Sequence, residues 1–400
     1  MTAQAEPSGH AMVYFLAAAQ ALAMTGASLV VTVSALAGKM LAPTPDLATM
    51  PFAFQFVGTM LATIPANLFM ARVGRRVGFS IGQGIGICGA LCSAAAIYMG
   101  DFWLFTAGSL LIGIHNSFWA YYRFAAAESV DAKFRPRAIS YVMAGGVVAA
   151  VAGPQLAKES LELLAPVLFA GSYLAFACLA VVTILVLQFV RVPTPHVDKK
   201  AGGGRPLKEI AKQPEFIVAV LSSTLGYGVM SLVMTATPLA MVACGFAFED
   251  AAFVIQWHVL GMFAPSFFTG ALIRKFGVLK IILTGTLLNG VCMGMNLMGI
   301  ELLNFWVALV ALGIGWNFMF IGGTTLLTGT YEPEERAKVQ SANDFTVFTM
   351  VALASFSSGA LQNLIGWEAV NAAASLPILI AFAAVVWLWM TRKRLRTSVS

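Results

Sequence analysis

Polar side chains inside long apolar runs are the residues of this sequence that could do chemistry. One such run, residues 102–124, carries His115, Asn116, Trp119 and Arg123. Spacings of three and four residues bring helical side chains onto one face. That face would combine a titratable imidazole, an amide, an aromatic ring and a cation. We expect His115, deep in the run, to bind substrate or couple to protons. Arg123 lies near the end of the run and could equally anchor it at the lipid headgroups.

A second polar group lies in the apolar run 251–272, where Gln256, Trp257 and His258 follow one another. Ionisable groups inside such runs are costly and usually functional. His258 lies close to one end of its run. It is therefore either an interfacial residue or part of a binding site.

The later run 302–329 contributes Trp316 and Asn317, which lie within one residue of the positions equivalent to His115 and Asn116 in a repeat described below. Corresponding positions on two helices favour a shared central pocket. Further polar candidates, individually weaker, are Gln20, Gln55, Tyr227 and Asn289. Each of these four could instead form ordinary hydrogen bonds between helices.

The chemical character of these candidates limits the ligand. They are mostly aromatic and amide side chains without acids at mid-run, which suits a neutral or weakly anionic small molecule with a flat ring. The two histidines lie on different runs, so no metal-binding cluster is predicted, and no nucleotide-binding loop or other cofactor motif occurs. A membrane-embedded enzyme or sensor is a remote alternative, because no coupled catalytic set is present.

Composition places the whole chain in a membrane. Of its 400 residues, 59% are hydrophobic and 10% are charged, whereas soluble domains carry roughly 25% charged residues. A run of about 20 apolar residues crosses the hydrocarbon core. Twelve such runs are predicted, at residues 12–37, 50–70, 79–99, 102–124, 138–157, 163–190, 215–243, 251–272, 279–299, 302–329, 339–364 and 367–390.

The positive charges orient these spans. If the N-terminus is cytoplasmic, 22 of the 24 lysines and arginines fall in cytoplasmic segments, and Lys39 and Lys158 alone lie outside. This asymmetry satisfies the positive-inside rule. We therefore expect a monomeric, multi-pass protein of the cell inner membrane with both termini in the cytoplasm. The basic residues are spread over six segments, which argues against nucleic-acid binding.

The sequence also predicts two similar halves. Residues 111–118 (LIGIHNSF) resemble residues 311–318 (ALGIGWNF), and Arg137-Ala138 corresponds to Arg336-Ala337. Residues 191–214 are rich in proline, glycine and basic residues and read as a cytoplasmic linker. We expect six-helix bundles at 1–190 and 215–400, rocking about a site between them.

The turn after the second span carries a recognisable motif. Arg72, Gly74, Arg75 and Arg76 match the loop signature Gly-x-x-x-Asp-Arg-x-Gly-Arg-Arg, although Asn67 replaces its first glycine and Ala71 its aspartate. On this motif and the repeated halves, the sequence resembles the major facilitator superfamily over nearly its whole length. The resemblance implies an all-α membrane fold of twelve helices, in two pseudo-symmetric bundles, that transports a solute by alternating access.

The motif also implies a cytoplasmic latch. The turn at Gly74 would present its guanidinium groups to helix C-termini and to the carboxylates of Glu128 and Asp344. In the second half, the corresponding turn contains Arg274, Lys275 and Gly277, and the acids expected to meet it are Glu332, Glu334 and Glu335. The alternative is that these charges only anchor loops at the headgroups.

The resemblance leaves direction and coupling open. Gly153-Pro154 looks like a diluted exporter motif, but the antiporter arginine would align with Ser109, so import is favoured. The stretches 65–76 and 256–270 resemble a bacterial subgroup of riboflavin importers from alphaproteobacteria. The alternative is a drug/proton antiporter. Proton symport, proton antiport and facilitated diffusion are all compatible with the titratable residues.

Overall fold

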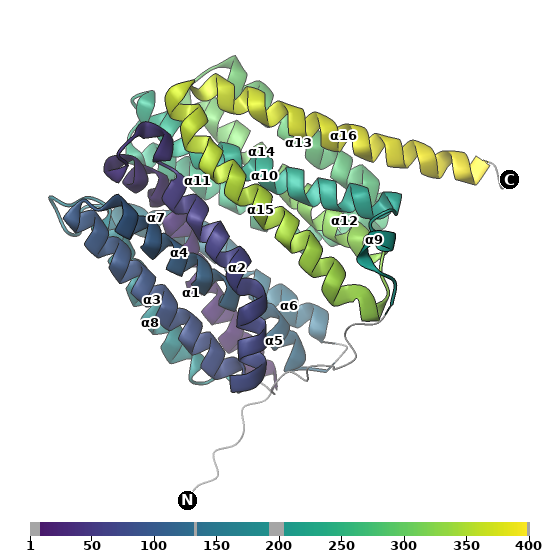
Figure 1. Cartoon of the computed structure of the whole chain (residues 1–400), viewed down its shortest axis with the longest axis horizontal. Coiled ribbons are helices and arrows are strands. Elements are labelled where there is room, and N and C mark those ends of the chain that lie inside the picture. Colours follow the sequence, from purple (N-terminus) through teal and green to yellow (C-terminus); the bar gives the residue numbers. More distant parts are fainter. Residues whose placement is uncertain (1–8, 132–133, 192–203, 398–400) are drawn as a thin grey trace, which may run out of the picture. The chain divides into compact units, whose positions relative to one another are not determined.

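A computed structural model describes residues 9–131, 134–191 and 204–397 (Figure 1). The described residues form helices joined by short turns, and they contain no strand. The predicted all-α fold is confirmed. By their contacts the residues divide into two compact units, 1–41 with 54–197, and 42–53 with 198–400.

The first unit is built from helices of the N-terminal part of the chain, with the first four residues of its second helix grouped in the second unit. They are α1 (Gly9–Leu41), α2 (Met50–Val73), α3 (Arg75–Met99), α4 (Phe102–Trp119), α5 (Tyr122–Glu128), α6 (Arg135–Met143), α7 (Gly145–Ser160) and α8 (Ala170–Leu187). Within it α3 packs on both α4 and α8, and α1 packs on α7 and α8. Asp101 caps the N-terminus of α4 by accepting hydrogen bonds from the N–H groups of Trp103 and Leu104.

The second unit contains the remaining helices. They are the 3₁₀ turn η1 (Pro45–Leu47), α9 (Leu207–Ile210), α10 (Pro214–Ala243), α11 (Phe248–Phe263), α12 (Ser266–Phe276), α13 (Val278–Met298), α14 (Leu302–Thr328), η2 (Pro333–Glu335), α15 (Arg336–Leu364) and α16 (Trp367–Thr397). Here α14 packs on α10, α11 and α13, while α10 also contacts α15 and α16.

Each of the twelve predicted spans contains helix in the part of the chain that the structure describes. Ten helices are long and apolar enough to cross a membrane, and the pair α11–α12, bent by 45°, gives an eleventh. The remaining span contains α4, which is 18 residues long and includes the polar residues His115 and Asn116. These polar residues lower the mean hydropathy of α4, which is why it is not among the helices counted as apolar enough to cross a membrane.

Two predicted spans need correction. The span predicted at 102–124 breaks at Ala120–Tyr121 between α4 and α5. The span predicted at 163–190 becomes helical only at Ala170. Pro166 lacks an N–H and disfavours a helical conformation in the residue before it, so the chain makes turns before α8 begins.

Close helix crossings occur at equivalent places in the two units. In the first, a Cβ on Gly113 of α4 would lie 2.0 Å from the carbonyl oxygen of Gln55 on α2. In the second, a Cβ on Gly313 of α14 would lie 2.4 Å from the carbonyl oxygen of His258 on α11. Glycine at both positions lets the backbones touch, as is common between membrane helices. The repeat seen in the sequence thus reappears as repeated packing.

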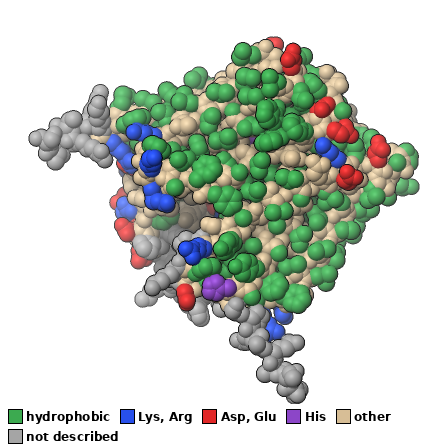
Figure 2. Space-filling view, turned by 180° about the vertical axis from the view of Figure 1, so that it is seen from behind, with side chains coloured by type: hydrophobic (Ala, Val, Ile, Leu, Met, Phe, Trp, Pro, Cys, Tyr) green, Lys and Arg blue, Asp and Glu red, His purple; other side chains and the backbone are tan. Residues whose placement is uncertain are grey.

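Large apolar side chains cover the outside of the molecule. Figure 2 shows hydrophobic side chains spread over one face, with charged side chains grouped mainly toward its edges. Leucines and phenylalanines such as Leu61, Leu185 and Phe267 are more than half exposed. A soluble protein rarely exposes apolar surface on this scale, so lipid is the surrounding solvent.

The segment 42–53, which follows α1 and includes the first turn of α2, is bonded to α15. The hydroxyl of Thr49 donates to the carbonyl of Phe356 (3.2 Å) and accepts from the N–H of Gly359 (2.9 Å). Asn363 Nδ2 donates to the carbonyl of Pro45 (2.8 Å). Thr49 is fully buried, and a Cβ on Gly359 would lie 2.6 Å from its hydroxyl. This segment therefore groups with the second unit.

The predicted linker 191–214 lies partly outside the described residues, at 192–203. Its last part is anchored. Arg205 donates to Glu335 from its backbone N–H (2.6 Å), Nε (3.0 Å) and Nη2 (2.8 Å). These hydrogen bonds, with that from the N–H of Glu332, lower the pKa of Glu335 to about 2. Glu335 is thus bonded to the linker, which differs from the expected pairing with Arg274 and Lys275. A separation of 130 residues in the chain hides such a pair from local sequence patterns.

Candidate functional site

Aromatic side chains from four helices meet in the second unit. Trp316 of α14 stacks on Phe320 one turn later, with ring centroids 5.1 Å apart and planes 9° from parallel. Tyr227 of α10 lies edge-on to both, at 5.2 and 5.5 Å. Phe263 of α11 and Phe348 of α15 complete the group, which we call the aromatic cluster. Offset and edge-on contacts of this kind are the favourable geometries for aromatic rings.

The aromatic cluster retains an unused hydrogen-bond donor. The indole Nε1 of Trp316 is buried and has no hydrogen-bond partner among the described residues. Tyr227, Phe320, Phe263 and Phe348 are each only partly buried. A buried N–H is costly when it is left unpaired. The cluster therefore combines aromatic ring faces with an unused hydrogen-bond donor, the two kinds of group by which a protein can hold a flat ring.

A second aromatic group lies between α11 and α14. Trp257 meets Trp306 edge-on at 5.6 Å, and Phe253 stacks on Trp306 at 6.4 Å. The indole N–H groups of Trp257 and Trp306 are also buried without partners among the described residues. Gln256 precedes Trp257 and is partly buried. Among the sequence candidates, Trp257 thus lies in a different aromatic group from Trp316.

The two membrane histidines hold helices together. Nδ1 of His115 lies 3.1 Å from the carbonyl of Gly82 on α3, and Nδ1 of His258 lies 2.8 Å from the carbonyl of Leu309 on α14. Because a carbonyl oxygen only accepts, Nδ1 carries the proton in both rings. Both histidines are fully buried. In each ring Nε2 is left as the acceptor.

The other fourth-span candidates are spread over α4 and α5. Trp119 Nε1 donates to Asn116 Oδ1 at 3.0 Å, one turn earlier on α4. Arg123 follows the break at Ala120–Tyr121, is exposed, and lies over the ring of Phe124 at 4.8 Å. The break means that Arg123 does not continue the helical face of His115. The expected single face is divided between two helices.

The side-chain amides of Gln20, Gln55 and Asn289 are buried and differ in their hydrogen bonds. Gln20 Oε1 on α1 and Gln55 Nε2 on α2 are buried and lack partners among the described residues. Asn289 Nδ2 on α13 instead donates to the carbonyl of Gly285 and to the sulfur of Met319. All three amides therefore keep one buried polar atom without a partner among the described residues, which in Asn289 is Oδ1, while its Nδ2 is engaged within the bundle.

Asn317 holds the bend between α11 and α12. Its Nδ2 donates to the carbonyl of Met262 and to the hydroxyl of Ser266, both at 2.7 Å. Its Oδ1 accepts from the hydroxyl of Thr269 at 2.7 Å. These residues flank the break at Ala264–Pro265, where helical hydrogen bonding is interrupted. The geometry gives Asn317 a structural contact, and its neighbour Trp316 lies in the aromatic cluster.

The two glycine turns predicted from the motif adopt the same backbone conformation. Gly74 has φ 87° and ψ 156°, and Gly277 has φ 89° and ψ 147°. This region is essentially restricted to glycine. Each glycine is the N-cap of the following helix, α3 or α13. The second-half turn is thus a structural copy of the first, although the sequence there matches the motif only in part.

Arg75 follows Gly74 and is paired with Glu128. Its Nη2 lies 2.9 Å from Glu128 Oε1 and 3.2 Å from Oε2, and its guanidinium lies over the ring of Tyr121. Arg75 is buried, while Glu128 is partly exposed. This ion pair joins the α2–α3 turn to the end of α5.

The remaining gating candidates lie near these turns. Asp344 of α15 accepts from the side chain of Asn343 and belongs to the second unit. Lys275 lies over the ring of Phe276 at 5.2 Å. Arg72, Arg76 and Arg274 are exposed. In α7, Gly153 packs against Ser28 of α1 and Pro154 is buried, so this pair lies at the α1–α7 contact.

Sequence reasoning missed three members of the aromatic cluster, Phe263, Phe320 and Phe348. Phe320 could have been found, because it follows Trp316 by four residues and helical side chains at that spacing are neighbours. Phe263 and Phe348 lie on other helices. Their contacts depend on the packing of α11 and α15, which no local spacing reveals.

Comparison with known proteins settles the family. The model of the Major Facilitator Superfamily matches residues 16–257 and 245–400. The chain belongs to the Major Facilitator Superfamily. The predicted fold and the role as a secondary transporter are thereby confirmed. This Major Facilitator protein is a multi-pass membrane protein that acts on a small-molecule substrate.

Individual relatives of this Major Facilitator chain are similar over most of its length. The riboflavin transporter RfnT of Brucella anthropi is 42% identical over 361 residues, covering 90% of this chain and 91% of the relative. The uncharacterized MFS-type transporters YddS and YdeG of Bacillus subtilis are 27% and 29% identical. Each covers 89% of this chain, and the alignments span 86% and 87% of those relatives. The predicted resemblance to riboflavin importers is confirmed by the first of these.

Proposed function

We propose that this transporter imports riboflavin, or a closely similar flat-ring metabolite, by alternating access across the inner membrane. The observation that carries the proposal is the aromatic cluster around Trp316, with its stacked rings and unpaired indole N–H. An isoalloxazine ring is flat, apolar on its faces and rich in hydrogen-bond acceptors at its edge. The 42% identity with a riboflavin transporter supports the same substrate.

The proposal includes an orientation, a driving ion and an oligomeric state. The charge asymmetry supports cytoplasmic termini, and a monomer suffices because both bundles lie in one chain. Proton symport through His115 is the proposed coupling, since its Nδ1–H is held by Gly82 and Nε2 could accept the proton. pH-independent uptake, with full activity in His115→Ala, would contradict this coupling.

The test is riboflavin binding and uptake by the purified protein. Flavin fluorescence, which stacking on tryptophan quenches, reports Kd, and radiolabelled riboflavin reports uptake into proteoliposomes. Stacking is worth about 1–3 kcal/mol per ring, so Trp316→Ala should weaken binding roughly 5- to 150-fold. Trp316→Phe should retain most of the affinity.

The matched control is Trp103→Ala, because Trp103 is 61% exposed and lies outside the aromatic cluster. It should bind riboflavin like the parent protein. Absence of riboflavin binding by the parent would contradict the substrate. Equal Kd values for Trp316→Ala and the parent would instead contradict the site. Outward movement of hydrophobic dyes against a proton gradient would point to the drug/proton antiporter.

A further inference from the structure

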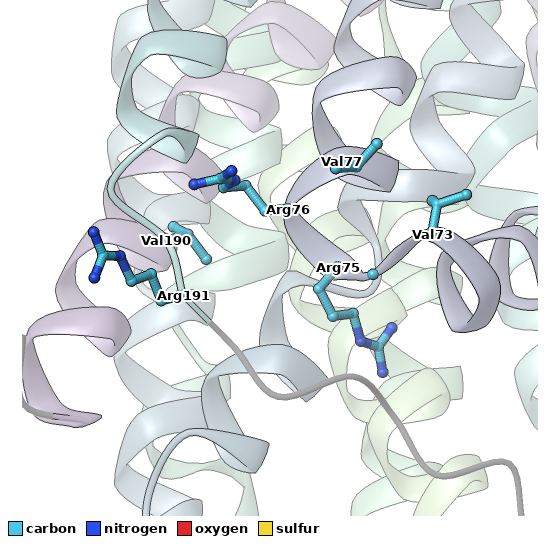
Figure 3. Close-up of a pocket in the computed structure, with 7 residues that line it drawn as sticks. Val73, Arg75, Arg76, Val77, Val190 and Arg191 are labelled. Atoms are coloured by element: carbon cyan, nitrogen blue, oxygen red, sulfur yellow. The ribbon is translucent and has the colours of Figure 1, made fainter. Parts of the chain in front are cut away.

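A small pocket of about 180 Å³ lies at the turn between α2 and α3. Residues 73–77 line one side, and Val190 and Arg191, just after α8, line the other. Figure 3 shows Arg76 and Arg191 on the same side of the turn, while Arg75 extends away from both. The aromatic cluster and the membrane histidines lie elsewhere in the chain. This pocket is therefore separate from the candidate substrate site.

The pocket carries uncompensated positive charge. Among the described residues Glu128 neutralises Arg75, but Arg76 and Arg191 have no acidic partner. Two further nitrogens of Arg75, Nε and Nη1, are buried without hydrogen-bond partners in the described part of the chain. The 25-residue helix α3 begins at Arg75, and its first turn contains no acid. The positive end of its dipole adds to the arginine charges.

An apolar surface continues from the pocket along α3 and α8. Val77 and Ile81, one turn apart on α3, are 45% and 41% exposed. Leu185 and Phe189, one turn apart at the end of α8, are also exposed. Between the two helices Gln188 Nε2 donates to Ser80 Oγ at 3.3 Å. The basic pocket is thus followed by a polar contact between α3 and α8 and by exposed apolar side chains on both.

We propose that this pocket binds the phosphate group of an anionic phospholipid. Arg76 and Arg191 hold the phosphate, and an acyl chain lies along Val77, Ile81 and Phe189. Guanidinium groups match phosphate oxygens in charge and geometry. A free phosphate shares that chemistry, but it would leave the adjoining apolar surface unused. Anionic lipids are also concentrated in the cytoplasmic leaflet, where the positive-inside rule places this turn.

The experiment measures lipids retained by the full-length protein. Protein from nanodiscs containing equal amounts of phosphatidylglycerol and phosphatidylcholine is released and analysed by native mass spectrometry. The parent protein should retain phosphatidylglycerol at least three-fold over phosphatidylcholine. The double variant Arg76→Gln/Arg191→Gln should lose this preference.

The matched control is Lys212→Gln/Lys280→Gln, which removes two exposed positive charges from the second unit. It should keep the preference of the parent. If the arginine double variant does not fold, the single variant Arg191→Gln, outside the helices, should still lower the preference at least two-fold. An unchanged preference in every arginine variant overturns the proposal. If millimolar inorganic phosphate displaced the retained phosphatidylglycerol, the site would be assigned to free phosphate instead.

Discussion

Asn317 was expected to line a pocket, and the structure gives it a different contact. All three of its hydrogen bonds reach residues that flank the α11–α12 break. Its neighbour Trp316 lies in the aromatic cluster instead. Consecutive residues on a helix point about 100° apart, so a single polar-aromatic dipeptide can serve two purposes. At the residue scale, stability and binding are therefore separable here.

Replacing Asn317 should test this separation. Asn317→Ala removes three hydrogen bonds, each worth about 0.6 kcal/mol on average within a membrane, so a loss of about 2 kcal/mol is expected. The apparent Tm in detergent should fall, while riboflavin affinity at low temperature changes little. Asn67→Ala is the control, because Asn67 is exposed on α2. A Tm equal to that of Asn67→Ala would contradict the structural role.

The Arg205–Glu335 pair predicts a pH dependence for the linker anchor. The folded-state pKa of Glu335 is lowered to about 2, against about 4.3 for an ordinary glutamate. Because ionised Glu335 is favoured in the folded state, its ion pair contributes fully to stability above about pH 4.3. That contribution to stability is lost as the pH falls toward 2. The anchor should therefore remain intact between pH 5 and 8.

A spin label on Lys208→Cys, in a background without the exposed cysteines, measures this anchor. The label should be immobilised at pH 7 and gain mobility only below about pH 4.3. Glu335→Gln should show the mobile spectrum already at pH 7. Glu334→Gln, a neighbouring exposed acid, should behave like the parent. Increased mobility of the parent between pH 7 and 5 would contradict the anchor.

At the scale of elements, the glycine turns repeat more faithfully than their side chains. Gly74 and Gly277 differ by only 2° in φ and 9° in ψ. Around a Cβ at either position there is open space within 4 Å. The requirement for glycine is therefore set by the backbone alone. Both turns join two antiparallel membrane helices, so their conformation fixes how α2 meets α3 and how α12 meets α13.

Alanine at either turn should destabilise the protein through backbone strain. We expect Gly74→Ala and Gly277→Ala each to cost about 1–3 kcal/mol and to lower the apparent Tm. Gly84→Ala is the control, because Gly84 lies inside α3 with open space around it. That change should be neutral or slightly stabilising, since alanine favours a helix interior over glycine. Equal Tm values for the three variants would contradict the strain.

Some elements could be predicted from sequence and others could not, for physical reasons. The helices follow from apolar runs of membrane-spanning length, and the pairing of Arg75 with Glu128 followed from the motif. The breaks at Ala120 and near Pro166 depend on local backbone geometry, which hydropathy averaged over a run of residues does not reveal. Arg205–Glu335 and the aromatic cluster join residues far apart in the chain. Only Trp316–Phe320, four residues apart, left a local signal.

At the scale of the whole molecule, the charge distribution makes a prediction about sidedness. Lys39 lies in the last turn of α1, and Lys212 lies just before α10, both exposed. The proposed orientation puts Lys39 outside and Lys212 in the cytoplasm. In intact cells, a membrane-impermeant maleimide should label Lys39→Cys and leave Lys212→Cys unlabelled until the membrane is opened. The reverse pattern would invert the proposed topology.

The bond between Thr49 and α15 has a consequence for a chain that is made in two pieces. Splitting the gene between codons 191 and 204 would place Thr49 on one polypeptide and Gly359 on the other. The N–H of Gly359 would then donate to the Thr49 hydroxyl of the other polypeptide. The side-chain amide of Asn363 would likewise donate to the carbonyl of Pro45 on that polypeptide. Two such fragments, translated separately, should recover each other in the bilayer without a peptide bond between them.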